Sequence, residues 1–176
     1  MKIISVVFQI SKYNDDSVFE CMVFPNLDFE CLSKENLRCV DKLLKYEKKI
    51  KYEGGGEYIL PISDVINVMS DRFGFLVLFN EKPARFSKEK KFPWFFERPN
   101  NAAIYNSDGS LRHQLIVPEQ YKQQGWYIHS TYYADFPNLK GFGVMVTNDH
   151  EYPALCFCLY DGTPNLVWTG YQQERR

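Results

Sequence analysis

The sequence predicts an α+β fold, in which a mostly antiparallel β-sheet forms a C-terminal meander and one or two helices lie in the N-terminal half. Three observations predict this class. A hairpin signal spans residues 101–118, short apolar runs recur from residue 126 onward, and apolar side chains in residues 33–51 lie near the helical spacing. With 176 residues, of which 45% are hydrophobic, the chain can bury a core, and we expect residues 1–176 to form a single domain.

The hairpin prediction rests on the stretch from Asn101 to Pro118. Two apolar runs flank residues 106–109, which end in Asp108-Gly109. Asp-Gly is a strong hairpin signal, because glycine adopts a positive φ without a Cβ clash. The residues from Leu111 to Val117 then alternate between two faces, as in a strand, and Pro118 should end that strand because it cannot donate to a ladder.

A second hairpin is predicted at the N-terminus. Residues 2–10 and 17–24 are rich in valine, isoleucine and phenylalanine, and turn-forming residues separate them. Pro25-Asn26 should end the second run.

Two helices are predicted next. Over Ser33–Lys51 the apolar residues recur near helical spacing, and lysines crowd the second half, where cations complement the helix dipole. The glycines at 54–56 then form a loop. Ser63-Asp64 should cap a second, short helix over Val65–Asp71.

The remaining apolar runs predict strands. Phe73–Phe79 is apolar on both faces, which indicates a central buried strand, whereas Phe92–Phe96 is either a strand or an irregular plug. Later runs are each ended by turn residues and so predict an antiparallel meander. Its strands are expected at 126–134, 141–147, 153–160 and 166–171. The Asp-Gly turns at 108 and 161 are similar, which we interpret as converged hairpin chemistry rather than duplication.

The net charge is −1, so no overall field favours nucleic acid or a membrane as a partner. Acidic residues gather in the span 15–35 and lysines in the spans 42–51 and 82–91. The plain interpretation is a solvated surface, and the alternative is an acidic face that docks a basic partner. We take as candidate partner-binding residues Asp15, Asp16, Asp28, Glu30, Tyr132, Tyr133, Asp135, Asp149, Glu151 and Asp161.

No local pattern predicts catalysis or a cofactor. His113, His129 and His150 lack neighbours at metal-ligand spacing, and the sequence contains no nucleophile elbow and no phosphate-binding glycine pattern. Cys156 and Cys158 should point to one face of a strand, where we interpret them as small core residues rather than a metal pair. We therefore expect no enzyme activity, cofactor or metal.

Two alternatives stay open. One is an enzyme with a site assembled from distant residues, such as His113 or His129 with Asp135. The other is a sheet module that binds a small molecule or a peptide.

The cysteines and the N-terminus indicate a location. The five cysteines are irregularly spaced, which does not suggest a disulfide framework. The apolar N-terminal stretch is too short to span a bilayer and lacks a cleavage site. We expect a reduced, cytoplasmic protein.

The run IYNSDGSLRHQLIVP, residues 104–118, resembles a stretch found in small bacterial immunity proteins. These are encoded beside polymorphic toxins, including those of contact-dependent growth inhibition systems. The resemblance covers residues 98–176 and implies a cytoplasmic, non-enzymatic protein that binds the C-terminal domain of its cognate toxin, often a nuclease, and blocks it by occlusion. It carries over no contact residue, and we interpret Tyr105–Arg112 as scaffold. The oligomeric state is left open.

Overall fold

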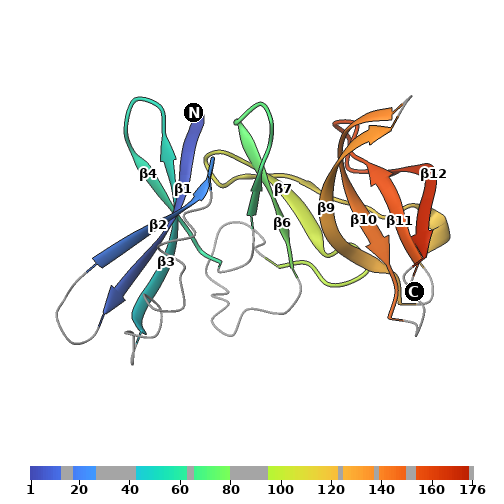
Figure 1. Cartoon of the computed structure of the whole chain (residues 1–176), viewed down its shortest axis with the longest axis horizontal. Coiled ribbons are helices and arrows are strands. Elements are labelled where there is room, and N and C mark those ends of the chain that lie inside the picture. Colours follow the sequence, from blue (N-terminus) through green and yellow to red (C-terminus); the bar gives the residue numbers. More distant parts are fainter. Residues whose placement is uncertain are drawn as a thin grey trace. The chain divides into compact units, whose positions relative to one another are not determined.

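The computed structural model describes residues 1–12, 18–26, 43–62, 66–79, 95–122, 125–136, 139–149 and 154–174. In these ranges twelve strands form three antiparallel four-stranded sheets (Figure 1). The helical structure in these ranges is a single 3-10 turn, η1, at Glu119–Tyr121. The predicted α+β class is therefore wrong, because the described chain is all-β.

The first sheet has the strand order β2-β1-β3-β4. Its strands are β1 (Ile3–Lys12), β2 (Val18–Phe24), β3 (Leu43–Tyr52) and β4 (Glu57–Leu60). Neighbouring strands are antiparallel throughout. The predicted N-terminal hairpin is confirmed, since β1 pairs with β2 and β2 ends at the residue before Pro25.

The helix predicted over Ser33–Lys51 is wrong in its described part, since residues 43–52 form β3. Residues 33–42 lie outside the described ranges. From residue 47 to 52 the side chains alternate between half-buried and buried, and Ile50 and Tyr52 are on the buried face. That period of two belongs to a strand with one face packed on the core. The lysines of this segment lie on both faces of the strand and do not mark the end of a helix.

The third sheet has the order β5-β6-β7-β8. Its strands are β5 (Ile66–Val68), β6 (Gly74–Leu78), β7 (Ala102–Asn106) and β8 (Leu111–Gln114). The central buried strand predicted over Phe73–Phe79 is confirmed, because β6 lies inside the sheet order and all five of its residues are buried.

The short helix predicted over Val65–Asp71 is wrong. Ile66–Val68 is β5, and a turn follows it, in which Arg72 N donates to the carbonyl of Met69 at 2.9 Å. The expected cap, Ser63-Asp64, lies outside the described ranges. A strand of three residues is too short for its period to be recognised in sequence.

The central hairpin is confirmed. β7 and β8 are antiparallel, and Gly109 in the turn has a φ of +83°. The second strand is shorter than predicted, because β8 ends at Gln114 and Ile116 instead forms a parallel bridge with Asn165.

The C-terminal meander is also confirmed. Strands β9 (Tyr127–Phe136), β10 (Leu139–Thr147), β11 (Ala154–Leu159) and β12 (Val167–Glu174) lie in the order β12-β11-β10-β9 (Figure 1). Each strand pairs antiparallel with the next one in the chain. The segment at 92–96 is a plug in its described part, where the rings of Phe95 and Phe96 pack edge-on against Phe79.

The chain divides into two compact units. The first comprises Met1–Ser63, Val68–Phe75 and Asn106–Ser110, and the second comprises Asp64–Asn67, Leu76–Tyr105 and Leu111–Arg176. The prediction of a single domain stays a prediction.

In the second unit, the fully buried side chain of Asn101 joins β9 to the end of β6. Its amide nitrogen donates to the carbonyl oxygens of Phe79 at 3.1 Å and Ile128 at 3.0 Å, and its amide oxygen accepts from the Ile128 N–H at 2.9 Å. The side chain therefore completes backbone groups that would otherwise be buried without partners.

Replacing Asn101 with alanine should lower the free energy of unfolding by about 2–5 kcal/mol, because several buried backbone groups lose their partner at once. Urea unfolding followed by circular dichroism measures this. The matched control is Asn165→Ala, at an exposed asparagine, which should change stability by no more than about 0.5 kcal/mol. An equal loss in the two variants would contradict the role given to Asn101.

In the first unit, two tyrosines of the first sheet enclose the turn at residues 106–110. The Tyr52 hydroxyl donates to the Ser107 carbonyl at 2.5 Å. A Cβ atom on Gly109 would overlap the end of the Tyr58 ring and lie 2.6 Å from its Cε1 atom. The two tyrosines thus pack directly against the backbone of the turn, which agrees with interpreting this segment as scaffold.

The two Asp-Gly turns share their local hydrogen bonds. One carboxylate oxygen of Asp108 accepts from the N–H of Ser110 at 2.9 Å and from its hydroxyl at 2.6 Å. Asp161 accepts in the same way from Thr163, at 2.9 and 2.7 Å. In both turns the hydroxyl hydrogen bond is the main cause that lowers the pKa of the aspartate. Their packing differs, since nothing lies within 4 Å of a Cβ atom built on Gly162.

Gly109→Ala and Gly162→Ala separate backbone strain from packing. Both glycines have a positive φ, so each change should cost about 1–2 kcal/mol of unfolding free energy. Gly109→Ala should cost roughly 1–3 kcal/mol more, because the Tyr58 ring must move. Thermal and urea unfolding measure both, and the excess should disappear in a Tyr58→Ala background. An excess that persists there would refute the packing explanation.

Candidate functional site

The structure describes only part of the predicted partner-binding set. Asp15, Asp16, Asp28, Glu30 and Glu151 lie outside the described residues. The acidic N-terminal interface therefore stays a prediction. The lysine-rich span 82–91 also lies outside the described residues. The described members are Tyr132, Tyr133, Asp135, Asp149 and Asp161, all in the second unit.

Tyr133 and Asp135 share one face of β9, which is an end strand of its sheet. Tyr133 is 68% exposed. Asp135 forms an ion pair with Lys140 on β10 at 3.0 Å, and both side chains are exposed. Such a pair contributes little to stability, so either charge can exchange this partner for another.

Asp149 and Asp161 are exposed at other positions of the meander. Asp149 accepts from Arg98 at 2.6 Å, and the Arg98 guanidinium lies 3.6 Å from the centre of the Tyr127 ring. Its charge is thus partly compensated. Hydrogen bonds from the hydroxyl and the N–H of Thr163 lower the pKa of Asp161.

Tyr132 packs into the sheet instead of presenting its hydroxyl to solvent. Its ring lies edge-on to Phe157 at 5.0 Å and covers Gly143, where a Cβ atom would come within 2.8 Å of it. Burial, followed by the influence of Cys158, raises the pKa of Tyr132 to about 12. The Tyr132 hydroxyl is buried without a hydrogen-bond partner, as are those of Ser130 and Thr147. The strand register places all three on one face of β9 and β10.

Two tyrosine-to-phenylalanine variants should therefore change the free energy of unfolding by different amounts or in opposite directions. Tyr52→Phe removes the donor to the Ser107 carbonyl and should cost about 1–3 kcal/mol of unfolding free energy. Tyr132→Phe removes an unsatisfied buried hydroxyl and should be neutral or stabilising within about 1 kcal/mol. Urea unfolding of the two variants side by side tests this, and a larger loss for Tyr132→Phe would contradict it.

Cys156 and Cys158 are free thiols buried on the packed face of β11. Burial, followed by the influence of Cys156, raises the pKa of Cys158 to about 12. Both thiols are almost fully buried, as expected of small core residues. In the part of the chain that the structure describes, no group of three or more His, Cys, Asp and Glu side chains is placed to hold a metal.

The expectation of reduced cysteines is wrong at Cys21. This residue lies on β2, is buried, and is disulfide-bonded. The spacing of the cysteines does not predict this bond, because disulfide pairing depends on which cysteines the fold brings together.

The histidines of the enzyme alternative contact aromatic rings. The ring centres of His113 and Tyr160 are 6.3 Å apart, and those of His129 and Tyr127 are 6.1 Å apart. Asp135, the carboxylate assigned to that alternative, forms its ion pair with Lys140. His150 lies outside the described ranges.

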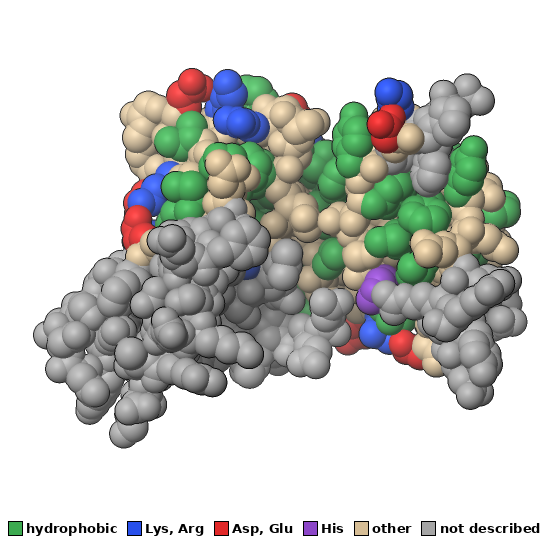
Figure 2. All heavy atoms as spheres, in the orientation of Figure 1, with side chains coloured by type: hydrophobic (Ala, Val, Ile, Leu, Met, Phe, Trp, Pro, Cys, Tyr) green, Lys and Arg blue, Asp and Glu red, His purple; other side chains and the backbone are tan. Residues whose placement is uncertain are grey.

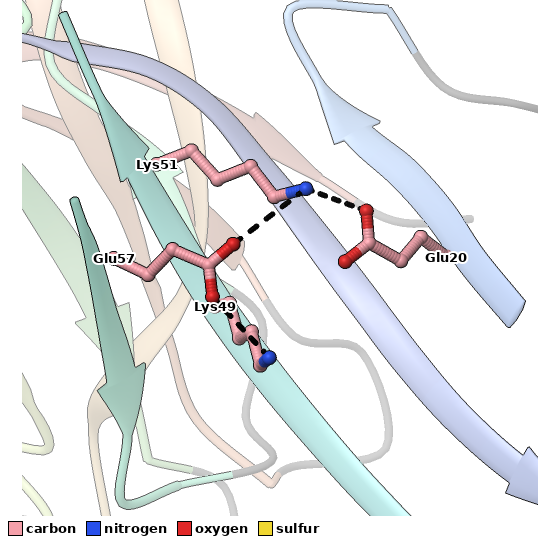
Figure 3. Close-up of polar contacts among 4 residues, drawn as sticks. All are labelled: Glu20, Lys49, Lys51 and Glu57. Carbon is pink, nitrogen blue, oxygen red and sulfur yellow. Dashed lines mark hydrogen bonds and ion pairs between the residues drawn. The ribbon is translucent and has the colours of Figure 1, made fainter. Parts of the chain in front are cut away.

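The first unit carries a charge network on the face of β3 opposite Ile50 and Tyr52 (Figure 3). Lys51 Nζ lies 2.5 Å from Glu20 and 3.8 Å from Glu57, and Lys49 lies 3.3 Å from Glu57. The hydrogen bond to Glu20 is the main cause that raises the pKa of Lys51. Opposite charges from three strands therefore compensate one another here, which favours the interpretation as a solvated face over a single-sign docking patch.

Sequence reasoning missed one exposed group. Val167, Trp168 and Tyr171 on β12 are 49%, 43% and 45% exposed. Figure 2 shows hydrophobic side chains gathered at the surface over the C-terminal strands. The signal in the sequence was the lack of any charged residue between Leu166 and Glu174, which a strand prediction alone does not weigh.

Among the residues described, no helix is long and apolar enough to cross a membrane. A scan against protein-family models, a search of curated proteins and a search of solved structures each found no match to this chain.

Proposed function

We propose that this chain is an immunity protein that binds a cognate bacterial toxin domain and blocks it by occlusion. The resemblance of residues 104–118 to such proteins supports this proposal. The turn within that run is packed against Tyr52 and Tyr58, as expected for a scaffold motif that presents other residues to the partner.

The exposed Tyr133 on the end strand β9 is the observation that supports the proposal most directly. Tyrosine is favoured as an interface anchor, since its ring buries a large area and its hydroxyl can bond at the rim. Asp135 lies beside it on the same face, and the exposed Asp161 adds a carboxylate in the turn before β12.

A nuclease is the toxin class that this surface fits best. A protein that binds nucleic acid presents basic residues to the phosphates, and Asp135 beside Tyr133 can exchange Lys140 for one of them. Such a protein acts in the cytoplasm of the producing cell. Disulfides are rare in a reducing compartment, so the disulfide at Cys21 counts against this location.

The direct experiment expresses this chain together with the toxin encoded beside its gene. Cells should survive with the pair and die with the toxin alone. Tyr133→Ala with Asp135→Ala should weaken binding of the purified toxin domain by roughly tenfold to hundredfold, measured by calorimetry.

The matched control is Ile59→Ala, an exposed apolar side chain on the first sheet, which should leave binding unchanged. Death of cells that carry both proteins would reject the proposed function. Survival with unchanged binding by the Tyr133/Asp135 variant would keep the function and reject this surface.

A further inference from the structure

The two Asp-Gly turns contain the same pair of groups that can react with each other. When glycine follows aspartate, the glycine nitrogen can attack Cγ of the aspartate side chain, because no Cβ atom on the glycine hinders the approach. An N–Cγ bond forms, and the N–H proton leaves with the OH group of the protonated carboxyl group as water. The product is a five-membered succinimide ring.

Water then opens this ring at one of its two carbonyl carbons. Opening at Cγ restores aspartate. Opening at the main-chain carbonyl gives isoaspartate, in which the main chain runs through Cβ and Cγ and the former main-chain carbonyl becomes a free carboxylate. The overall change from aspartate to isoaspartate consumes no atoms, since the water that leaves in the first step is replaced in the second.

The carboxyl groups of the two turns have matching surroundings. Asp108 and Asp161 are both exposed. Each accepts two hydrogen bonds from the residue two positions later, Ser110 or Thr163, at 2.6–2.9 Å. A difference in reactivity between the folded turns must therefore come from the glycine that follows.

The two glycine nitrogens differ. Gly109 is buried, and its N–H donates to the carbonyl of Asn106 at 2.9 Å, while the end of the Tyr58 ring covers the glycine. Gly162 is exposed, and nothing lies within 4 Å of a Cβ atom built on it. In the part of the chain that the structure describes, the N–H of Gly162 donates no hydrogen bond.

We propose that Asp161, followed by Gly162, is a site at which the folded chain forms isoaspartate, while the fold protects Asp108. The Gly162 nitrogen has no hydrogen bond to break before it attacks, and the turn around it is open. At Asp108 the bond to Asn106 must break and the glycine must leave the Tyr58 ring, which requires local opening of the structure. This modification does not involve the toxin and goes beyond the proposed function.

Isoaspartate at residue 161 changes the connection between β11 and β12. It lengthens the main chain of the turn by one carbon atom and moves the carboxylate that Thr163 now contacts. The same turn is joined to residue 116, because Ile116 N donates to the Pro164 carbonyl at 2.8 Å and Leu166 N donates to the Ile116 carbonyl at 3.0 Å. The modification therefore falls where the C-terminal sheet is tied to the segment before η1.

Ageing of the purified full chain at neutral pH and physiological temperature, without reductant, tests the proposal. Enzymatic methylation of isoaspartate measures its amount, and peptide mapping with electron-transfer fragmentation measures its position. Isoaspartate should accumulate at residue 161 at least roughly tenfold faster than at residue 108, because only the second site needs local opening. Equal rates in the folded chain, or no isoaspartate at residue 161, would overturn the proposal.

The same chain aged in urea is the control for the intrinsic reactivity of the two sequences. Each Asp-Gly pair is followed by a hydroxyl residue, so the two sites should react at similar rates once the fold is lost. An excess at residue 161 that is as large in urea as in the folded chain would show that the sequence, and not the structure, selects the site.

Two variants locate the reaction and its protection. Asp161→Glu keeps the charge but would need a six-membered ring, which forms far more slowly, so the product at residue 161 should disappear. Tyr58→Ala uncovers Gly109 and should raise the rate at residue 108 several-fold in a chain that keeps the parent circular dichroism spectrum. Methylation that persists unchanged in Asp161→Glu would overturn the assigned site, and an unchanged rate at residue 108 in Tyr58→Ala would overturn the protection assigned to the ring.

Discussion

A single buried amide, that of Asn101, sets how the second unit is built. All of its hydrogen bonds go to backbone groups of Phe79 and Ile128, so a side chain takes the place of a strand partner. The residue stands directly before β7, which means that the hairpin starts from a point already tied to both β6 and β9. Asparagine suits this position because its amide carries donors and acceptor on one planar group. An aspartate could not donate, and an apolar residue could do neither.

The sequence predicted strands well where turn chemistry marked both ends. The meander from β9 to β12 and the hairpin of β7 and β8 were recognisable, because Asp-Gly turns and alternating residues are local signals. The helix prediction failed at β3 for a physical reason. Lys49 and Lys51 pair with Glu57 on the neighbouring strand β4, and Lys51 also pairs with Glu20 on β2, 31 residues away in sequence. Local spacing cannot report a charge pair that only the sheet creates.

The candidate site, like the fold, could be predicted from the sequence only in part. Tyr132 and Tyr133 are adjacent and identical in type, yet one covers Gly143 and the other is exposed. Which of them faces solvent depends on the register of β9, and a bulge opposite Met145 and Val146 shifts that register. A shift of one residue exchanges the faces of a strand, so sequence alone could name the pair but not choose between its members.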